Sequence, residues 1–246
     1  MITFTQYLFE AHDFVFKYHD HLNTSIWKTD QTLKPNVLKK LKKIANKYYE
    51  FLKTEDYKIV DIIITGSLAN YNYTIFSDID LHVIIDAAVD DCKDCGLDLV
   101  DFLDTKKKLW GEEHDITIYN YPVELYAQLK DDTLTATGVY SIVHNKWVLK
   151  PKHIDKLEDK IDQYAVNIKA KEIKKQIDDL IETNSTDITA IKKLKTKIKN
   201  MRTSGLKKSG EFSVENLVFK ELRNSNYLEK LQTLKTSAFD TALSIY

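Results

Sequence analysis

Hydrophobic residues recur at helical spacing near both ends of the chain, and a β-branched region separates the two helical parts. Residues 1 to about 20 have apolar side chains three or four positions apart, which predicts an amphipathic first helix. A second helix is expected to begin near Pro35, because proline is favoured in the first turn of a helix. Its apolar stripe consists of Val37, Leu41, Ile44, Tyr48 and Phe51.

The middle of the chain has the pattern of a mixed sheet. Residues 58–65 (KIVDIIIT) are short and β-branched, as in a buried strand. Further strands are expected at 77–86, 115–119 and 123–127, with a helix at 97–110 and a hairpin at 138–149 that turns at His144-Asn145.

After Pro151 the pattern is almost entirely helical. One helix face is expected to carry Leu157, Ile161, Tyr164 and Ile168, continued by Ile177 and Leu180. Another is expected to carry Ile188, Ile191, Leu194, Ile198 and Met201. Residues 202–212, which contain two glycines, are expected to form a loop, and Ser213 is expected to cap the next helix. We therefore expect an α/β (α+β) fold with N-terminal helices at 1–53, a mixed-sheet core at 54–150 and a helical domain at 151–246.

Composition narrows the class of protein. The formal net charge is -1, but aspartates crowd residues 78–104 and lysines dominate residues 146–208, so an acidic site and a basic arm are both expected.

No apolar run approaches the roughly 20 residues that span a bilayer, and no secretory signal is evident, so we expect a cytoplasmic protein without membrane partners. Cys92 and Cys95 are interpreted as free thiols, because a zinc site needs two more ligands.

Asp78 and Asp80 carry the clearest candidate chemistry. They stand two positions apart on an expected strand, and a period of two points both carboxylates out of one face. Carboxylates held this close repel each other, and a divalent cation removes that repulsion. Hard oxygen ligands of this kind suit Mg²⁺, which completes its coordination with water and substrate phosphates.

Gly66 and Ser67 follow the preceding buried strand. Glycine lets the backbone approach a phosphate closely, and the serine hydroxyl can donate to its oxygens. The order of strand, Gly-Ser, short segment and Asp-x-Asp strand therefore predicts a phosphate cradle beside a metal site.

The segment IIITGSLANYNYTIFSDIDLHVII resembles the nucleotidyltransferase superfamily, which includes DNA polymerase β, the CCA-adding enzymes and the minimal nucleotidyltransferases. The shared pattern is an apolar strand, Gly-Ser, and then aspartates alternating with hydrophobic residues; Ser77 before Asp78 also fits. The clear resemblance covers residues 58–127. It implies a two-metal phosphoryl transfer with two Mg²⁺ ions, or Mn²⁺ in their place, and an NTP substrate, with ATP as the default.

The resemblance also implies a third carboxylate on a following strand. Glu124, between Val123 and Leu125, is the preferred candidate, and Asp115 on the neighbouring expected strand is the competitor. His82 shares the face of the two aspartates and is expected either to touch substrate or to stand at the edge of the site.

The helical arm offers further cations. Arg202, Lys207 and Lys208 lie in the expected loop and are candidates to bind a triphosphate or an acceptor backbone, the alternative being exposed charges that serve solubility. In the superfamily a helical domain commonly closes over the nucleotide, which makes this loop worth testing.

The first eleven residues, MITFTQYLFEA, have a second resemblance. They resemble the capsid-targeting segment of internal proteins of T-even-type bacteriophages, which is cleaved after a glutamate; here that bond is Glu10-Ala11. Ile2 departs from the usual lysine of that segment. This resemblance implies a phage origin. The protein would then be located either in the host-cell cytoplasm or, if packaged, in the virion.

The leading function is therefore transfer of a nucleoside monophosphate from an NTP to a hydroxyl of RNA, protein or a small molecule. The alternatives are a catalytically inactive phage internal protein with this fold and a toxin-like module that nucleotidylates host tRNA or protein. No motif selects the base, the acceptor or the oligomeric state.

Overall fold

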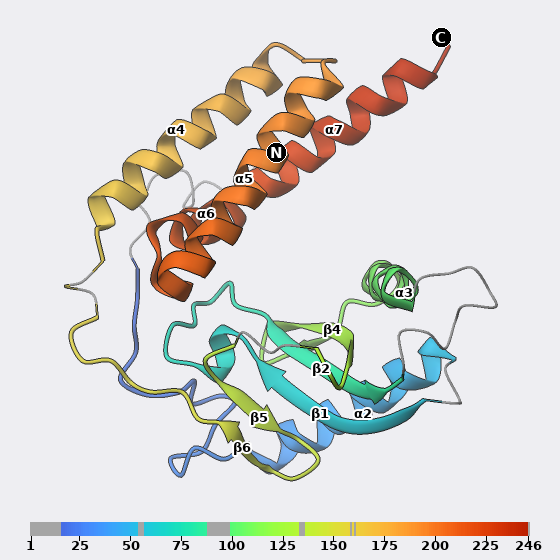
Figure 1. Ribbon diagram of the computed structural model, residues 1–246, viewed down its shortest axis with the longest axis vertical. Helices are drawn as coiled ribbons and strands as arrows, with labels where there is room; N and C mark the ends of the chain where they lie inside the picture. Colours follow the sequence, from blue (N-terminus) through green and yellow to red (C-terminus); the bar gives the residue numbers. More distant parts are fainter. Residues whose placement is uncertain are drawn as a thin grey trace. The chain divides into compact units, whose positions relative to one another are not determined.

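The computed structural model describes residues 16–53, 57–87, 99–132, 136–157, 159 and 161–245. These residues form two compact units (Figure 1). Lys17–Asp155 contains the sheet, and Lys156–Tyr246 together with Phe16 makes up the helical unit.

A six-stranded mixed sheet forms the centre of the first unit, in the order β3-β4-β2-β1-β5-β6. Its only parallel pair among the described strands is β2 with β4; the other neighbours are antiparallel. The predicted α/β class is confirmed. The strands are β1 (Lys58–Thr65), β2 (Ile79–Asp86), β3 (Thr117–Ile118), β4 (Tyr121–Leu129), β5 (Val139–Ser141) and β6 (Lys146–Leu149).

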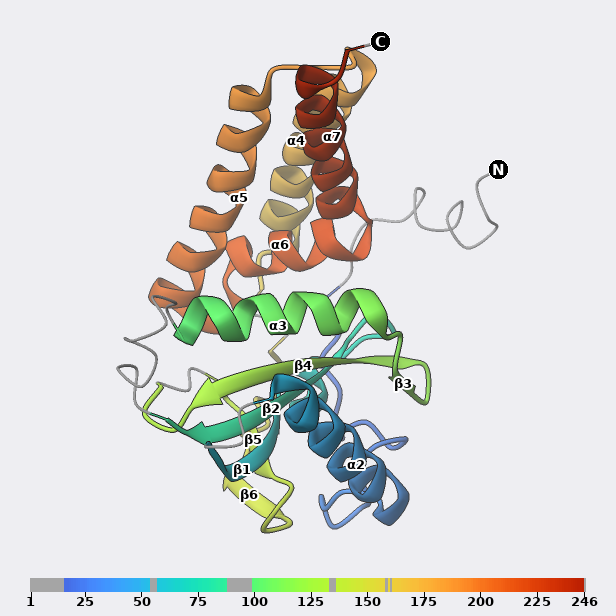
Figure 2. The same cartoon turned by 90° about the vertical axis from the view of Figure 1, so that its right-hand side faces the viewer.

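Two helices belong to the sheet unit, α2 (Pro35–Leu52) and α3 (Leu99–Glu113). Helix α2 begins at Pro35 as predicted, and its buried stripe joins one core cluster with the odd-numbered residues of β2, such as Leu81. Helix α3 lies between β2 and β3 in the sequence and runs beside β4 (Figure 2). Trp110 of α3 meets Tyr48 of α2 edge to face at 5.4 Å, so both helices share this core.

The residues before α2 form an irregular arm over the sheet unit. The expectation that a first helix reaches Asp20 is wrong for residues 16–20, which are not helical. The physical reason is that the backbone of this stretch finds a partner elsewhere: the His19 N–H donates to Tyr71 O at 2.8 Å. Farther along the segment, Trp27 Nε1 donates to Leu68 O at 2.7 Å. The rest of the expected helix, with Glu10-Ala11, lies outside the described residues, as do Cys92 and Cys95.

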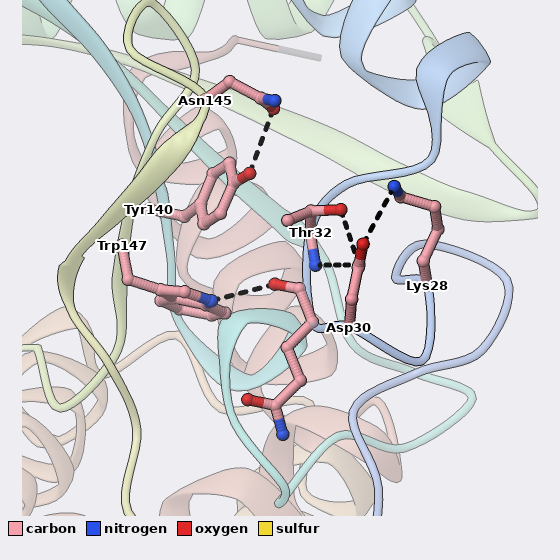
Figure 3. A network of polar contacts seen from close by, with 7 residues as sticks. Lys28, Asp30, Thr32, Tyr140, Asn145 and Trp147 are labelled. Carbon is pink, nitrogen blue, oxygen red and sulfur yellow. Dashed lines mark hydrogen bonds and ion pairs between the residues drawn. The ribbon is translucent and has the colours of Figure 1, made fainter.

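A polar network joins this arm to the β5–β6 hairpin (Figure 3). Trp147 Nε1 on β6 donates to Gln31 O at 2.8 Å. Asp30 accepts from the Thr32 N–H at 2.9 Å and from Lys28 Nζ at 3.1 Å. The hydrogen bonds from Thr32 lower the pKa of Asp30 to about 2, so this turn keeps its charge throughout the physiological range.

The helical unit contains α4 (Gln163–Glu182), α5 (Ile188–Ser209), α6 (Val214–Asn224) and α7 (Tyr227–Leu243). Ser213 caps α6 as predicted, since its side chain accepts from the Asn216 N–H. Lys169 on α4 pairs with Glu215 on α6 at 2.8 Å. Within the described ranges, no helix is both long and apolar enough to cross a membrane.

The face of α4 that packs inward differs in part from the predicted one. Tyr164 is 76% exposed and Ile168 is also exposed, whereas Val166, Ala170 and Ile173 are buried. Ile177 is buried, as predicted. The helix begins only at Gln163, after Asp162 accepts from the Ala165 N–H. Leu157 and Ile161 therefore precede the helix and do not set its phase.

The predicted loop at 202–212 is wrong, because α5 continues to Ser209 and a 3-10 turn (Gly210–Phe212) follows. Gly205 does not break the helix. A Cβ on Gly205 would lie 2.5 Å from Glu215 Cβ and 2.7 Å from Ser213 Oγ, so this glycine allows α5 to approach the start of α6 closely. Gly210, with φ +73°, is the residue at which the helix ends.

Candidate active site

Three carboxylates from adjacent strands meet at one end of the sheet. Asp78 directly precedes β2, Asp80 is the second residue of β2, and Glu124 lies near the start of β4. One carboxylate oxygen of each lies within 4.8 Å of the other two. The parallel register pairs Asp80 with Glu124, so the two strands place these side chains opposite each other.

The cluster lies on the sheet face opposite the α2 core. Ile79 and Leu81 are buried in that core, and the alternation of a strand turns Asp80 and His82 to the other face. The antiparallel register places Thr65, the last residue of β1, beside Asp80. Glu124, Asp80 and Thr65 thus form one row across three strands.

The backbone of Gly66 lies directly against the Asp80 carboxylate. It follows β1 with φ +75°, and a Cβ built there would lie 1.8 Å from Asp80 Oδ2. Only glycine combines this backbone conformation with such a close approach. The absence of a side chain at position 66 therefore leaves the space that the Asp80 carboxylate occupies in the acidic cluster.

Ser67 and Ser77 tie the Gly-Ser turn to the residue before Asp78. Ser67 Oγ donates to Ser77 Oγ at 2.8 Å, and Ser77 Oγ also accepts from the Thr74 N–H at 2.9 Å. Ser77 is buried, whereas Ser67 is half-buried. The structure thus brings the residues predicted for phosphate binding to the edge of the cluster, with the Ser77 hydroxyl holding the turn.

Glu124 has two neighbours that the sequence interpretation missed. The Tyr126 hydroxyl donates to Glu124 Oε2 at 2.5 Å, and Lys107 Nζ on α3 lies 3.8 Å from the same oxygen. Lys107 also stands 3.5 Å from the centroid of the Tyr126 ring. Burial, followed by the charges of Glu124 and Asp80, raises the pKa of Tyr126, so its hydroxyl remains a proton donor to Glu124.

His82, on β2 next to the cluster, contacts side chains of both neighbouring strands, β1 and β4. Its ring stacks on Tyr126 with centroids 4.5 Å apart, its Nδ1 lies 2.9 Å from Gln128 Oε1, and its Nε2 lies 3.4 Å from Thr65 Oγ1. Burial lowers the pKa of His82, and the charge of Lys107 lowers it further. A neutral ring between two side-chain partners fits the edge-of-site interpretation better than contact with substrate.

The donor set fits a hard divalent cation. Three carboxylate oxygens on one face suit Mg²⁺ or Mn²⁺, both of which favour oxygen ligands and leave positions for water and phosphate. Asp115 is exposed and is not part of this group. Among the described residues, Asp78, Asp80 and Glu124 are therefore the ones that could hold the metal.

The predicted cationic residues belong to the helical unit. Arg202, Lys207 and Lys208 are exposed on the last turns of α5, and the Arg202 guanidinium lies 4.2 Å from the centroid of the Phe219 ring. They are helical residues, not loop residues, and nucleotide binding by them stays a prediction.

A comparison with protein families connects this geometry to a known domain. The family model described as nucleotidyltransferase domain matches residues 45–201, well over half of the chain. The protein belongs to the nucleotidyltransferase domain family. The match runs from the middle of α2 through the whole sheet and into α5. No curated protein and no solved structure matched the chain.

The fit between Gly66 and Asp80 predicts that Gly66→Ala weakens metal binding by this nucleotidyltransferase domain. The new methyl group must displace the Asp80 carboxylate, so we expect the affinity for Mn²⁺ to fall by about 10-fold or more. Titration of Mn²⁺ followed by electron paramagnetic resonance measures this. Gly111→Ala is the matched control, because a Cβ on Gly111 meets nothing within 4 Å. Equal Mn²⁺ affinity in both variants would contradict the assigned role of Gly66.

The hydrogen bond from Tyr126 predicts that Tyr126→Phe weakens Mn²⁺ binding by about 10-fold, since Glu124 loses the group that orients it. Tyr227→Phe is the control, because the Tyr227 hydroxyl also donates to a carboxylate, Asp178 Oδ2, at 2.9 Å in the helical unit. The same titration compares the two variants, and thermal unfolding checks that both are folded. An unchanged affinity in Tyr126→Phe would show that Glu124 is oriented without this bond.

Proposed function

We propose that this protein transfers a nucleoside monophosphate from an NTP, ATP by default, to a hydroxyl acceptor. The acceptor oxygen forms a bond to the α-phosphorus, the bond from that phosphorus to the bridging oxygen breaks, and pyrophosphate leaves with the electron pair. The hydroxyl proton is released. The observation that carries the proposal is the set of three carboxylates within 4.8 Å beside the Gly66-Ser67 turn.

Each carboxylate has a proposed place in this reaction. Asp78 and Asp80 would hold the metal at the triphosphate, and Glu124 would hold it at the acceptor side. When bound there, Mg²⁺ or Mn²⁺ ions neutralise phosphate charge and favour ionisation of the acceptor hydroxyl. The strands contribute rigidity: because Asp80 and Glu124 are in register on paired strands, their separation changes little as substrate binds.

Phosphate binding is proposed for residues in both units. Gly66 and Ser67 offer a close backbone approach and a hydroxyl, and Ser77 supports that turn. Arg202, Lys207 and Lys208 offer exposed positive charge on α5 for the triphosphate or the acceptor. Accordingly, we propose residues 54–150 as the catalytic core and 151–246 as a separate helical domain.

Retained catalysis is the better proposal than an inactive relative that only binds partners. The acidic cluster is complete, and Tyr126 and Lys107 are arranged around its third member. A protein whose only task is interaction would have no need to hold three like charges together, because their repulsion destabilises the fold.

Asp80→Asn is expected to reduce NTP consumption by about 100-fold or more, because one of the charges that the reaction needs is removed while the shape is kept. The measurement is pyrophosphate release from each of the four NTPs in the presence of cell RNA and protein. EDTA should abolish the activity and Mg²⁺ should restore it.

Asp86→Asn is the matched control, since Asp86 lies at the far end of the same strand and pairs with Lys130 on the surface at 2.5 Å. All three tryptophans lie in the sheet unit, so their fluorescence verifies that this unit is folded in both variants. An Asp80→Asn protein as active as the Asp86→Asn protein would rule out the proposed site.

A further inference from the structure

A groove that the proposed reaction does not use lies in the sheet unit, between α2 and the segment that runs from the end of α3 to β3. Its cavity volume is about 690 Å³, within the range of ligand-binding pockets. One wall is the α2 face that carries Lys40, Lys43 and Lys47. The other wall carries the rings of Trp110, His114 and Tyr119.

The α2 wall is strongly cationic. Helix α2 has five lysines and a single acidic residue, Glu50. Glu50 pairs with Lys47 at 2.6 Å, whereas Lys40 and Lys43 form no ion pair within the described part of the chain. Two ammonium groups one helical turn apart are thus available beside an apolar floor.

The opposite wall offers aromatic faces held in place by their neighbours. Tyr119 is 50% exposed at the tip of the β3–β4 turn, where it and Asn120 both have positive φ, and its hydroxyl accepts from Asn36 Nδ2 at 2.6 Å. His114 stands edge to face with Trp110 at 4.1 Å. Trp110 itself is buried and supports His114, so the exposed rings of this wall are those of His114 and Tyr119.

We infer that this groove binds single-stranded nucleic acid. Cations that follow one wall match a phosphate backbone, and exposed rings on the other wall match unstacked bases; this is the combination that such binding requires. An acidic peptide without aromatic residues would use the lysines but would leave the rings without a stacking partner. A duplex keeps its bases stacked inside and would likewise leave the aromatic wall without a partner.

The groove lies on the α2 side of the sheet and the acidic cluster on the opposite face, and the two approach each other at the start of β4. Its wall residue Ile116 accepts a hydrogen bond from the Val123 N–H at 2.8 Å, and Val123 is adjacent to Glu124. A nucleic acid bound in the groove would therefore lie in the same unit as the acidic cluster. The groove's wall residue Ile116 contacts the residue next to Glu124. Nucleic acid binding by the groove does not depend on the proposed function. The further step, that the bound nucleic acid is an RNA whose end is the acceptor, rests on the proposed function.

The test is binding of fluorescently labelled single-stranded RNA, and of DNA with the same sequence, to the full chain in EDTA without NTP. We expect Lys40→Glu/Lys43→Glu to weaken binding by about 10-fold or more and to reduce its salt dependence. Lys39→Glu/Lys42→Glu makes the same charge change at the same spacing on α2 but outside the groove lining, so its affinity should stay within about 3-fold of the wild type. Tyr119→Ala should weaken binding by about 5-fold or more through lost stacking.

Three results would overturn the inference: no binding of either strand, equal loss in the two double-lysine variants, or equally tight binding of a poly-glutamate peptide. Tighter binding of RNA than DNA, or the reverse, supports the groove and identifies its ligand. The Asp80→Asn protein should bind as the wild type does. Groove-dependent binding without NTP consumption would therefore contradict only the proposed function, and NTP consumption without binding would contradict only this inference.

Discussion

Repulsion among Asp78, Asp80 and Glu124 is the constraint on which the site depends. Three negative charges within 4.8 Å oppose one another, and the repulsion is strongest where strands prevent the side chains from separating. The paired register of β2 and β4 imposes this closeness, and Lys107 offsets part of it at Glu124. A divalent cation bound there would remove the rest, so the same geometry that destabilises the metal-free protein would favour metal binding.

Contacts around the cluster keep its members in place from several directions. Gly66 leaves room behind Asp80, the Ser67–Ser77 bond fixes the turn before Asp78, and Tyr126 orients Glu124. Farther out, Trp27 donates to Leu68 in the 3-10 turn η1 (Ser67–Ala69), which carries Ser67. The irregular segment before α2 thus supports the Gly66-Ser67 turn.

Sequence patterns predicted the features that depend on local spacing. The apolar alternation of β2, the Pro35 start of α2 and the Ser213 cap were all visible in the chain, and Asp78 and Asp80 followed from the period of a strand. Features that depend on tertiary contacts were missed or misjudged. Gly205 looked like a loop residue because its close neighbour Glu215 comes from another helix, and Lys107 could not be linked to Glu124 without knowing where α3 packs. Tyr126 was within reach, since it shares the face of Glu124 two positions away.

Crystals grown with Mn²⁺ and a nonhydrolysable NTP test the central claim most directly. Anomalous diffraction at the manganese edge locates the ions independently of any assumption about the site. The account predicts anomalous peaks in contact with the carboxylates of Asp78, Asp80 and Glu124, with the triphosphate against the Gly66-Ser67 turn. Manganese bound elsewhere in the chain, with the three carboxylates free of it, would contradict the account.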